Sequence, residues 1–314
     1  MTATAAIARP SAHPARGRHG ALVNGCIQFI SSRDQCLENA LASLWDAFNR
    51  ERGYPVYVYY FDDIYDDPAL RERVRREIDP NVTFLAVPYR TPAHVPESEQ
   101  FHNRRDLWYV QHCFPPRRKG YLHMCHFNVN VFGYPGTRLH LHDWVINLDD
   151  EGGFQRPLAV DPFATMLERG LTLAAFRVVR RAPHQGMIDT RIGLWDLTRD
   201  YLAAHRITPA SPELRAVLAS ADPERAFHDL AWMDSYVVGT ELFRSASWRR
   251  WIDAVNRDGG IYKYRWGDNE IFSLYSHMHL GVPVDLGLVD DGTYRQDMFK
   301  QAQELAPGVK DLSR

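Results

Sequence analysis

Short apolar stretches alternate with amphipathic ones through the first third of the chain. Residues 21–30, 56–61 and 82–87 are short and hydrophobic, which predicts buried strands. Between them, residues 34–50 carry Leu, Trp and Phe at helical spacing, and residues 68–77 predict a second helix. This order of strand, helix, strand, helix, strand favours a parallel sheet with helices on both of its faces.

The pattern continues to residue 280 with two more strands and five more helices. We expect the strands at 144–148 and 171–179, and the helices at 121–132, 162–169, 188–204, 247–257 and 268–280. No internal repeat or long linker divides the chain. Residues 1–20 are rich in Ala, Pro, Arg and His and lack the apolar segment of a secretory signal. We therefore expect a disordered tail at 1–20 and a single domain at 21–314.

Composition narrows the class of protein. The chain has 314 residues, 45% of them hydrophobic, and a formal net charge of −2. This charge provides no basic field that would recruit nucleic acid or acidic membranes. No stretch approaches the roughly 18 apolar residues of a membrane span. The four cysteines have no metal-binding spacing, which is typical of a protein with reduced thiols. We expect a soluble cytoplasmic protein without nucleic-acid or membrane partners.

Acidic residues follow two of the predicted strands. Asp62 and Asp63 come after the second strand, and Asp149 and Asp150 come directly after the strand at 144–148. Parallel sheets bind ligands beyond the carboxyl ends of their strands. Acids there can hold a divalent cation that clamps the diphosphate of a nucleotide-sugar. The alternative for Asp149 and Asp150 is a solvated acidic turn before a pair of glycines.

Two features near the C-terminus suggest a substrate site. Aromatic and basic residues alternate up to Arg265, Trp266 and Asp268, a combination that can stack on a sugar or base and bind its phosphate or hydroxyl groups. The alternative is that Asp268 caps a helix and Trp266 lies in the core. Glu241 follows another apolar stretch, where it could act as nucleophile or charge stabiliser, or be an ordinary surface residue.

From about residue 21 to 295, the chain resembles the α-1,2-mannosyltransferases of fungal glycoprotein synthesis, glycosyltransferase family 15. The resemblance rests on ordered segments: Ser31 to Gln35, Tyr121 to Asn128, Trp144 to Asp150, Leu194-Trp195, Glu241, the Trp248 region, and Gly259-Gly260 followed by Arg265-Trp266-Gly267-Asp268. The order and spacing of these segments make the match more specific than any one of them alone.

The resemblance implies a GT-A fold, with a Rossmann-like, mostly parallel sheet flanked by helices. It also implies transfer of a mannose-like sugar from a GDP-linked donor to a hydroxyl acceptor, with retained configuration and assistance from manganese. Glu241 would lie beside the anomeric carbon. The implied donor-binding residues are Arg33, Tyr121, Asp149, Asp150, Arg265, Trp266, Asp268 and Arg295, with Asp149 and Asp150 also as metal ligands.

Three departures from the family pattern change these expectations. The family's metal-binding Glu falls at Leu148, and its metal-binding His falls at Arg295. An Arg at that position could neutralise the diphosphate directly, so we predict weak or absent manganese dependence. The third is that the sequence shows no membrane anchor. We therefore expect a small soluble acceptor.

Two other functions compete with this one. His140, His142 and Asp143 form a segment that could hold a metal in a hydrolase, with His123 and His126 nearby in the sequence. The alternative for these histidines is an exposed loop. The second competing function is a non-catalytic sugar-nucleotide binding protein that has lost turnover.

Overall fold

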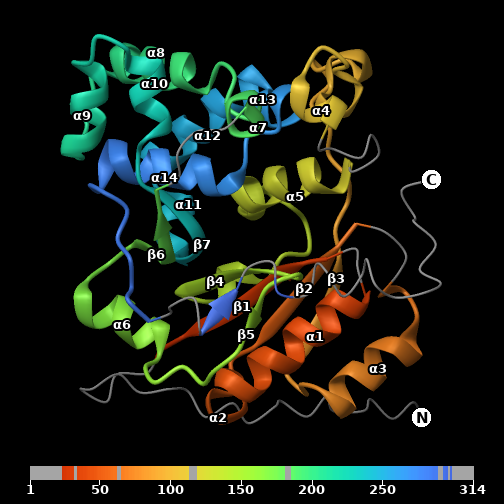
Figure 1. The fold of residues 1–314 in the computed structure, drawn as a ribbon. Coiled ribbons are helices and arrows are strands. Elements are labelled where there is room, and N and C mark those ends of the chain that lie inside the picture. The colour runs from red at the N-terminus through yellow and green to blue at the C-terminus, as the bar shows by residue number, and fades with distance from the viewer. Residues whose placement is uncertain are drawn as a thin grey trace, which may run out of the picture.

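The computed structural model describes residues 23–31, 34–61, 65–112, 119–180, 185–288, 293–295 and 298. Its centre is a six-stranded sheet with the strand order β3-β2-β1-β4-β7-β6 (Figure 1). The strands are β1 (Gly25–Ile30), β2 (Val56–Tyr60), β3 (Val82–Ala86), β4 (Trp144–Asp149), β6 (Leu173–Val179) and β7 (Trp232–Gly239). A separate two-stranded sheet pairs β5 (Gly153–Phe154) with β8 (Tyr294–Arg295).

The prediction of a mostly parallel sheet is confirmed, and one of the six strands, β7, runs in the direction opposite to the other five. β1 pairs in parallel with β2 and β4, and β2 pairs in parallel with β3. β7 instead runs antiparallel to both of its neighbours, β4 and β6. The start of β7 therefore lies at the same edge of the sheet as the ends of β4 and β6.

Helices cover both faces of the sheet (Figure 1). One face carries α1 (Asp34–Leu44), which continues through the π-helical turn Trp45–Asn49 into α2 (Arg50–Arg52), together with α3 (Pro68–Glu77). The other face carries α5 (Lys119–Asn130), α11 (Thr240–Arg244), α12 (Ala246–Asp258) and α14 (Asp268–His279). The remaining helices are α4 (Trp108–His112), α6 (Pro162–Arg169), α7 (Gln185–Asp189), α8 (Leu194–His205), α9 (Pro212–Leu218), α10 (Pro223–His228) and α13 (Gly260–Tyr264).

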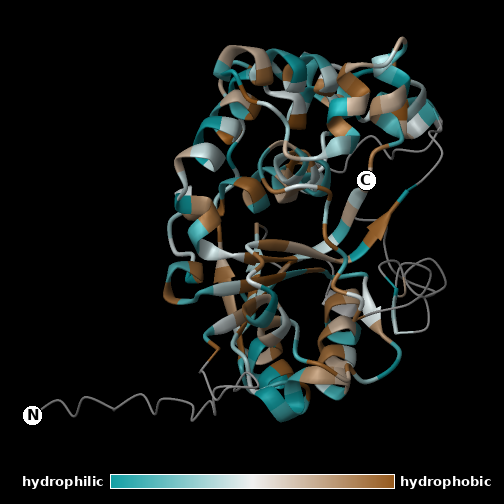
Figure 2. Cartoon of the chain, turned by 90° about the vertical axis from the view of Figure 1, so that its left-hand side faces the viewer, coloured by the Kyte–Doolittle hydropathy of each residue, from teal (hydrophilic) through white to brown (hydrophobic). Residues whose placement is uncertain are grey.

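Each face of the sheet has its own hydrophobic core. In β1, Cys26 packs into the core beneath α5 and α14, whereas Ile27 and Phe29 pack into the core beneath α1. Successive residues of a strand point to opposite faces, so strands covered on both sides are hydrophobic at almost every position. Figure 2 shows the resulting concentration of hydrophobic residues in the strands.

A recurrent local signal starts several of these helices. In four of them, an Asp or Ser side chain accepts a backbone N–H of the first turn, and Pro occupies the first helical position, where it loses no helical hydrogen bond. The capping residues are Asp67, Asp161, Ser211 and Asp222.

The structure corrects one expected helix. The pattern at 188–204 predicted a continuous helix, but α7 ends at Asp189 and α8 begins at Leu194. Gly193 separates them with a φ of +73°, a conformation that glycine adopts without the strain of a Cβ. In the part of the chain that the structure describes, no helix is long and apolar enough to cross a membrane.

Candidate functional site

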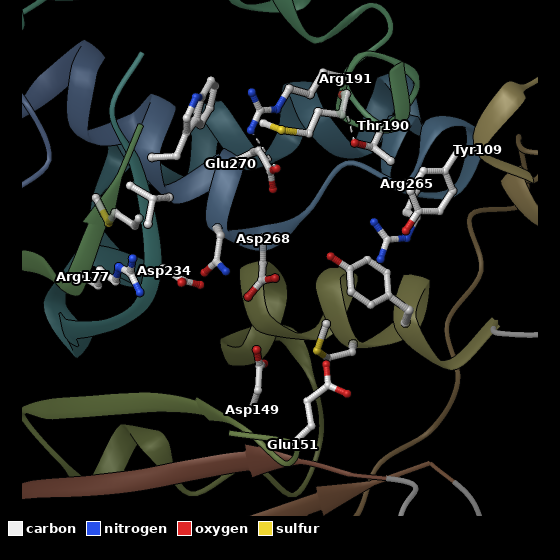
Figure 3. Close-up of a pocket in the computed structure, with 18 of the residues that line it drawn as sticks. Tyr109, Asp149, Glu151, Arg177, Thr190, Arg191, Asp234, Arg265, Asp268 and Glu270 are labelled. Atoms are coloured by element: carbon white, nitrogen blue, oxygen red, sulfur yellow. Dashed lines mark hydrogen bonds and ion pairs between the residues drawn. The ribbon is translucent and has the colours of Figure 1, made fainter. Parts of the chain in front are cut away.

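A pocket of about 560 Å³ opens where β4 and β6 end and β7 begins. α4, α5, α7 and the start of α14 complete its walls (Figure 3). The lining residues are mostly polar or charged: five carboxylates and four arginines, with Tyr109, Tyr121, Thr190 and Asn269 among the others. The carboxylates are Asp149, Glu151, Asp234, Asp268 and Glu270, and the arginines are Arg177, Arg191, Arg265 and Arg295.

The first turn of α14 places two of these carboxylates. Gly267 is the N-cap residue, and Asp268 and Glu270 lie in the first turn, where the helix dipole favours negative charge. A Cβ on Gly267 would lie 2.2 Å from Glu270 Oε2, so a larger residue there would displace the end of the Glu270 side chain. Glu270 also pairs with Arg191 at 3.3 Å, and the Arg191 guanidinium stacks over the Trp232 ring at 3.9 Å.

Asp268 is held from beneath by two donors. Asn128 Nδ2 donates to Asp268 Oδ2 at 2.7 Å, and the Tyr236 hydroxyl donates to the same oxygen at 3.2 Å. Burial raises the pKa of Asp268 to about 6, although the hydrogen bond from Asn128 acts in the opposite direction. Asp149 points from the end of β4 toward Asp268 across the pocket (Figure 3).

Arg265 lies between two aromatic rings on the other side of the pocket. Its guanidinium carbon is 3.7 Å from the centroid of the Tyr121 ring and 5.2 Å from that of Tyr109. Its backbone is left-handed, with a φ of +64°, which is uncommon for a residue with a side chain. The rings and the turn fix a cationic group that reaches the pocket.

Trp266 does not share the position of its neighbours. It is fully buried, and its Nε1 donates to the carbonyl oxygen of Ile192 at 2.9 Å. Its ring lies so close to Gly260 that a Cβ there would be 2.3 Å away. The prediction that Trp266 binds the donor is therefore wrong: the left-handed turn at Arg265 directs one side chain into the pocket and the next into the core.

Asp149 and Asp150 also face different surroundings. Asp149 lines the pocket, whereas Asp150 is buried and accepts a hydrogen bond from Ser31 Oγ at 2.6 Å. Adjacent residues at a strand end point to opposite sides, so the expected pair of metal ligands does not form. Asp150 instead connects the ends of β4 and β1. Among the described residues, no three His, Cys, Asp or Glu side chains form a group that could hold a metal ion.

Glu241 lies at the wrong edge of the sheet for its predicted role. It is exposed in the first turn of α11, just after the end of β7. Gly239 pairs with Trp144 at the start of β4, whereas the pocket is at the other end of β4. The antiparallel direction of β7 explains the error, because the pocket receives the start of that strand. The carboxylate that β7 contributes is Asp234.

The backbone beside Asp234 is unusual. Ser235 has a φ of +49°, in the left-handed region that residues with a side chain seldom adopt within a strand. Asp234 pairs with Arg177 of β6 in the sheet register, and the two side chains lie together at one end of the pocket (Figure 3). Such backbone outliers cluster at functional sites.

β8 brings Arg295 to the pocket. Its strand pairs with β5, with Arg295 opposite Gly153. Tyr294 is buried against Phe154 and Phe176. A Cβ on Gly152 would lie only 2.2 Å from the Tyr294 hydroxyl. Of the other sequence-predicted residues, Tyr121 lines the pocket. Arg33, Asp62 and Asp63 lie outside the described residues.

The histidines of the competing hydrolase do not form a site. His140 is exposed, whereas His142 is buried, and its two ring nitrogens bond to Tyr57 Oη at 2.9 Å and Asn24 Oδ1 at 3.0 Å. Burial lowers the pKa of His142 to about 4. His126 of α5 is hydrogen-bonded through Nδ1 to the Tyr134 hydroxyl at 2.7 Å. These bonds give His126 and His142 structural roles.

Several pocket residues were missed from the sequence. Arg177 and Asp234 could have been found from the ends of their strands, had the direction of β7 been known. Glu270 lies two residues after Asp268, and its position in the first helical turn was a usable signal. Arg191 and Tyr109 carried no sequence signal, because only tertiary packing brings α4 and the turn after α7 to the pocket.

The strand order, the single antiparallel strand and the pocket at the sheet edge define a GT-A type glycosyltransferase fold. Core-mannan synthase A from Aspergillus fumigatus, solved in a Mn/GDP form, superposes with a TM-score of 0.68 at 17% identity, covering 92% of this chain and 81% of the other. The mannosyltransferase Ktr4p from S. cerevisiae, in complex with GDP, gives a TM-score of 0.65 at 17% identity, covering 84% and 71%.

Residues 10–302 match the family model of the glycolipid 2-alpha-mannosyltransferases, and the chain belongs to this family. Alpha-1,2 mannosyltransferase KTR1 of Saccharomyces cerevisiae is 24% identical over 166 residues, which is 51% of this chain and 39% of that protein. Glycolipid 2-alpha-mannosyltransferase 1 of Candida albicans is 21% identical over 247 residues, which is 78% of this chain and 55% of that protein. The matches thus span less than two thirds of the length of these relatives.

Proposed function

We propose that this chain is a retaining glycosyltransferase that moves a mannose-like sugar from a GDP-linked donor to a hydroxyl acceptor. The observation that carries the proposal is the pocket itself, where arginines and carboxylates face one another at the edge of the sheet that binds ligands in such folds. Family membership and the GDP bound to two proteins of similar fold support the donor class.

In this proposal, Arg265 and Arg295 meet the diphosphate of the donor. The carboxylates of the pocket slightly outnumber its arginines, so the pocket has no positive field as a whole. Recognition of the diphosphate must then come from particular guanidinium groups, whose planar N–H donors match phosphate oxygens. Arg265 suits this role because two aromatic rings hold it in place.

We also propose that manganese contributes little or nothing. The protein of similar fold from A. fumigatus was solved with manganese, but the described residues here do not fit a preformed metal site. Asp149 lines the pocket without the neighbouring Asp150, which bonds to Ser31 instead. The arginines supply the cationic groups of the proposed mechanism, and no step depends on a metal ion.

At the reacting end of the donor, we assign to Asp234 the role first given to Glu241. A carboxylate beside the anomeric carbon can attack it or stabilise the positive charge that develops there. Asp234 is only partly buried, lies in the pocket and belongs to the start of β7, the strand whose end precedes Glu241. Asp268 then binds hydroxyl groups of the donor sugar.

The acceptor in this proposal is a small soluble alcohol, and the protein acts in the cytoplasm. The described cysteines, Cys26, Cys36 and Cys125, are buried and form no disulfide, which supports a reducing compartment. The near-neutral net charge supports the absence of a nucleic-acid partner.

A thermal-shift assay with GDP, UDP, ADP and CMP, each with and without manganese, tests the donor class and the metal together. A nucleotide at about 100 times its Kd stabilises the folded protein by about 2.7 kcal/mol. We expect GDP to give the largest shift, and manganese to leave that shift unchanged. Stabilisation by GDP only with manganese would contradict the metal proposal. A larger shift with another nucleotide would contradict the donor proposal.

A further inference from the structure

A chain of buried polar side chains lies beneath the pocket and connects the sheet to Asp268. Gln28 of β1 and Asn147 of β4 are opposite each other in the parallel register, and both point toward α5. Gln28 Nε2 donates to Asn147 Oδ1 at 2.7 Å and to Asn128 Oδ1 at 3.2 Å. Asn128 Nδ2 in turn donates to Asp268 Oδ2 at 2.7 Å.

This arrangement fixes the orientation of the Asn128 amide. Gln28 supplies a donor to the amide oxygen, so only the amide N–H groups of Asn128 can face Asp268. A rotated amide would place its oxygen against the carboxylate and its N–H group against the donor of Gln28. All three residues are buried, where unmatched polar groups are costly.

The network also selects which oxygen of Asp268 meets a ligand. Asn128 and Tyr236 both donate to Oδ2, and neither bond uses Oδ1. Because Asp268 lines the pocket, Oδ1 is the oxygen available to a donor sugar. Fixing one oxygen from beneath orients the other toward the ligand, as a binding carboxylate requires.

We propose that Asn128 is a positioning residue, which aims the Asp268 carboxylate into the pocket and is itself oriented by Gln28 and Asn147. The inference rests on the proposed function, since it assumes that Asp268 binds the sugar of the donor. Asn128 contacts no substrate in this arrangement and acts only through Asp268.

Charge explains why Asp268 needs such a donor. Burial raises the pKa of Asp268, and Glu270 raises it further, whereas the hydrogen bonds from Asn128 and Tyr236 lower it. Other titratable groups facing Asp268 are Asp149, across the pocket, and Tyr121 and Cys125 of α5. Loss of Asn128 therefore raises the pKa of Asp268, and the acid limb of the activity profile moves to higher pH.

The test compares Asn128→Ala with Asn130→Ala. Asn130 lies two residues further along α5 and bonds to Asn256 instead, through two amide contacts of 2.7 and 3.2 Å, so it loses similar bonds away from the pocket. We expect Asn128→Ala to lower kcat about 10- to 100-fold, the effect of one hydrogen bond to a charged group. GDP affinity stays within about threefold, and Asn130→Ala keeps the parent kcat.

A double-mutant cycle with Asp268→Asn shows whether Asn128 acts through the carboxylate. If it does, Asn128→Ala adds little in the Asp268→Asn background. Gln28→Met is a second variant that leaves α5 unchanged, and we expect a smaller loss of kcat because the Asn128 amide can then rotate. The inference is overturned if Asp268→Asn lowers kcat while Asn128→Ala and Asn130→Ala behave alike. Full activity of Asp268→Asn would instead overturn the proposed role of Asp268.

Discussion

The most direct test of the active site is to replace, one at a time, the carboxylates that lie near the two ends of β7. Asp234→Asn and Glu241→Gln each replace a carboxylate by an amide of nearly the same shape. Asp234 lines the pocket at the start of the strand, and Glu241 follows its end. The two substitutions therefore change the same chemical group at opposite edges of one sheet.

The structure sets the expected magnitudes. Gly239 lies five positions after Asp234, which corresponds to about 17 Å of extended strand. This is beyond the screening length of about 8 Å at physiological salt, and Glu241 is exposed, so its charge has almost no effect in the pocket. We expect Glu241→Gln to keep kcat within about twofold. Removing a carboxylate that stabilises the transition state costs about 100- to 1,000-fold, which we expect for Asp234→Asn.

The assay is release of GDP from GDP-mannose with a panel of small alcohols and sugars as acceptors, at saturating donor. GDP affinity, measured by thermal shift, should remain near that of the parent protein in both variants. Such a result separates loss of chemistry from loss of binding. The reasoning is refuted if Glu241→Gln abolishes transfer while Asp234→Asn does not.

Two further predictions rest on single contacts, and a third rests on the burial of Asp268. Gly260→Ala places a Cβ against the buried ring of Trp266 and should lower the free energy of unfolding by about 1–3 kcal/mol, measured by urea denaturation, with GDP affinity unchanged. Tyr109→Ala removes one ring beside Arg265 and should weaken GDP binding about threefold, measured by titration calorimetry; an unchanged Kd would contradict a role for this ring. Activity should fall as the pH drops through about 6, because Asp268 has a raised pKa and becomes protonated there; a kcat that stays constant down to pH 5 would contradict this dependence.

Periodicity predicted most of the elements but not their neighbours in the sheet. The strands and helices up to residue 87 and the helix α14 appear close to their expected bounds. Strand direction is a different kind of property, because it depends on where the intervening chain leads. Between β6 and β7 the chain forms α7, α8, α9 and α10 before it returns. Nothing in the apolar pattern of β7 itself distinguishes the two directions in which it could pair.

Side-chain direction within a motif was the second property that spacing did not reveal. Arg265, Trp266 and Asp268 lie within four consecutive positions, yet Arg265 and Asp268 line the pocket and Trp266 packs in the core. The left-handed turn at Arg265 is responsible, and an Arg is not a residue that signals such a turn. A resemblance to a family identifies the segment as functional without showing which of its side chains touch the ligand.

Asp149 and Asp150 are a third case, because the alternation of side chains along a strand is a property that the sequence does contain. The alternation of side chains along a strand already separates two adjacent residues once the first is placed in the strand. β4 extends to Asp149, one residue further than predicted, and this residue decides which acid faces the pocket. The same rule applied from the start of β7 makes Asp234 its pocket carboxylate. Pocket residues on a GT-A sheet can therefore be predicted from strand ends only when strand direction and the last strand residue are both known.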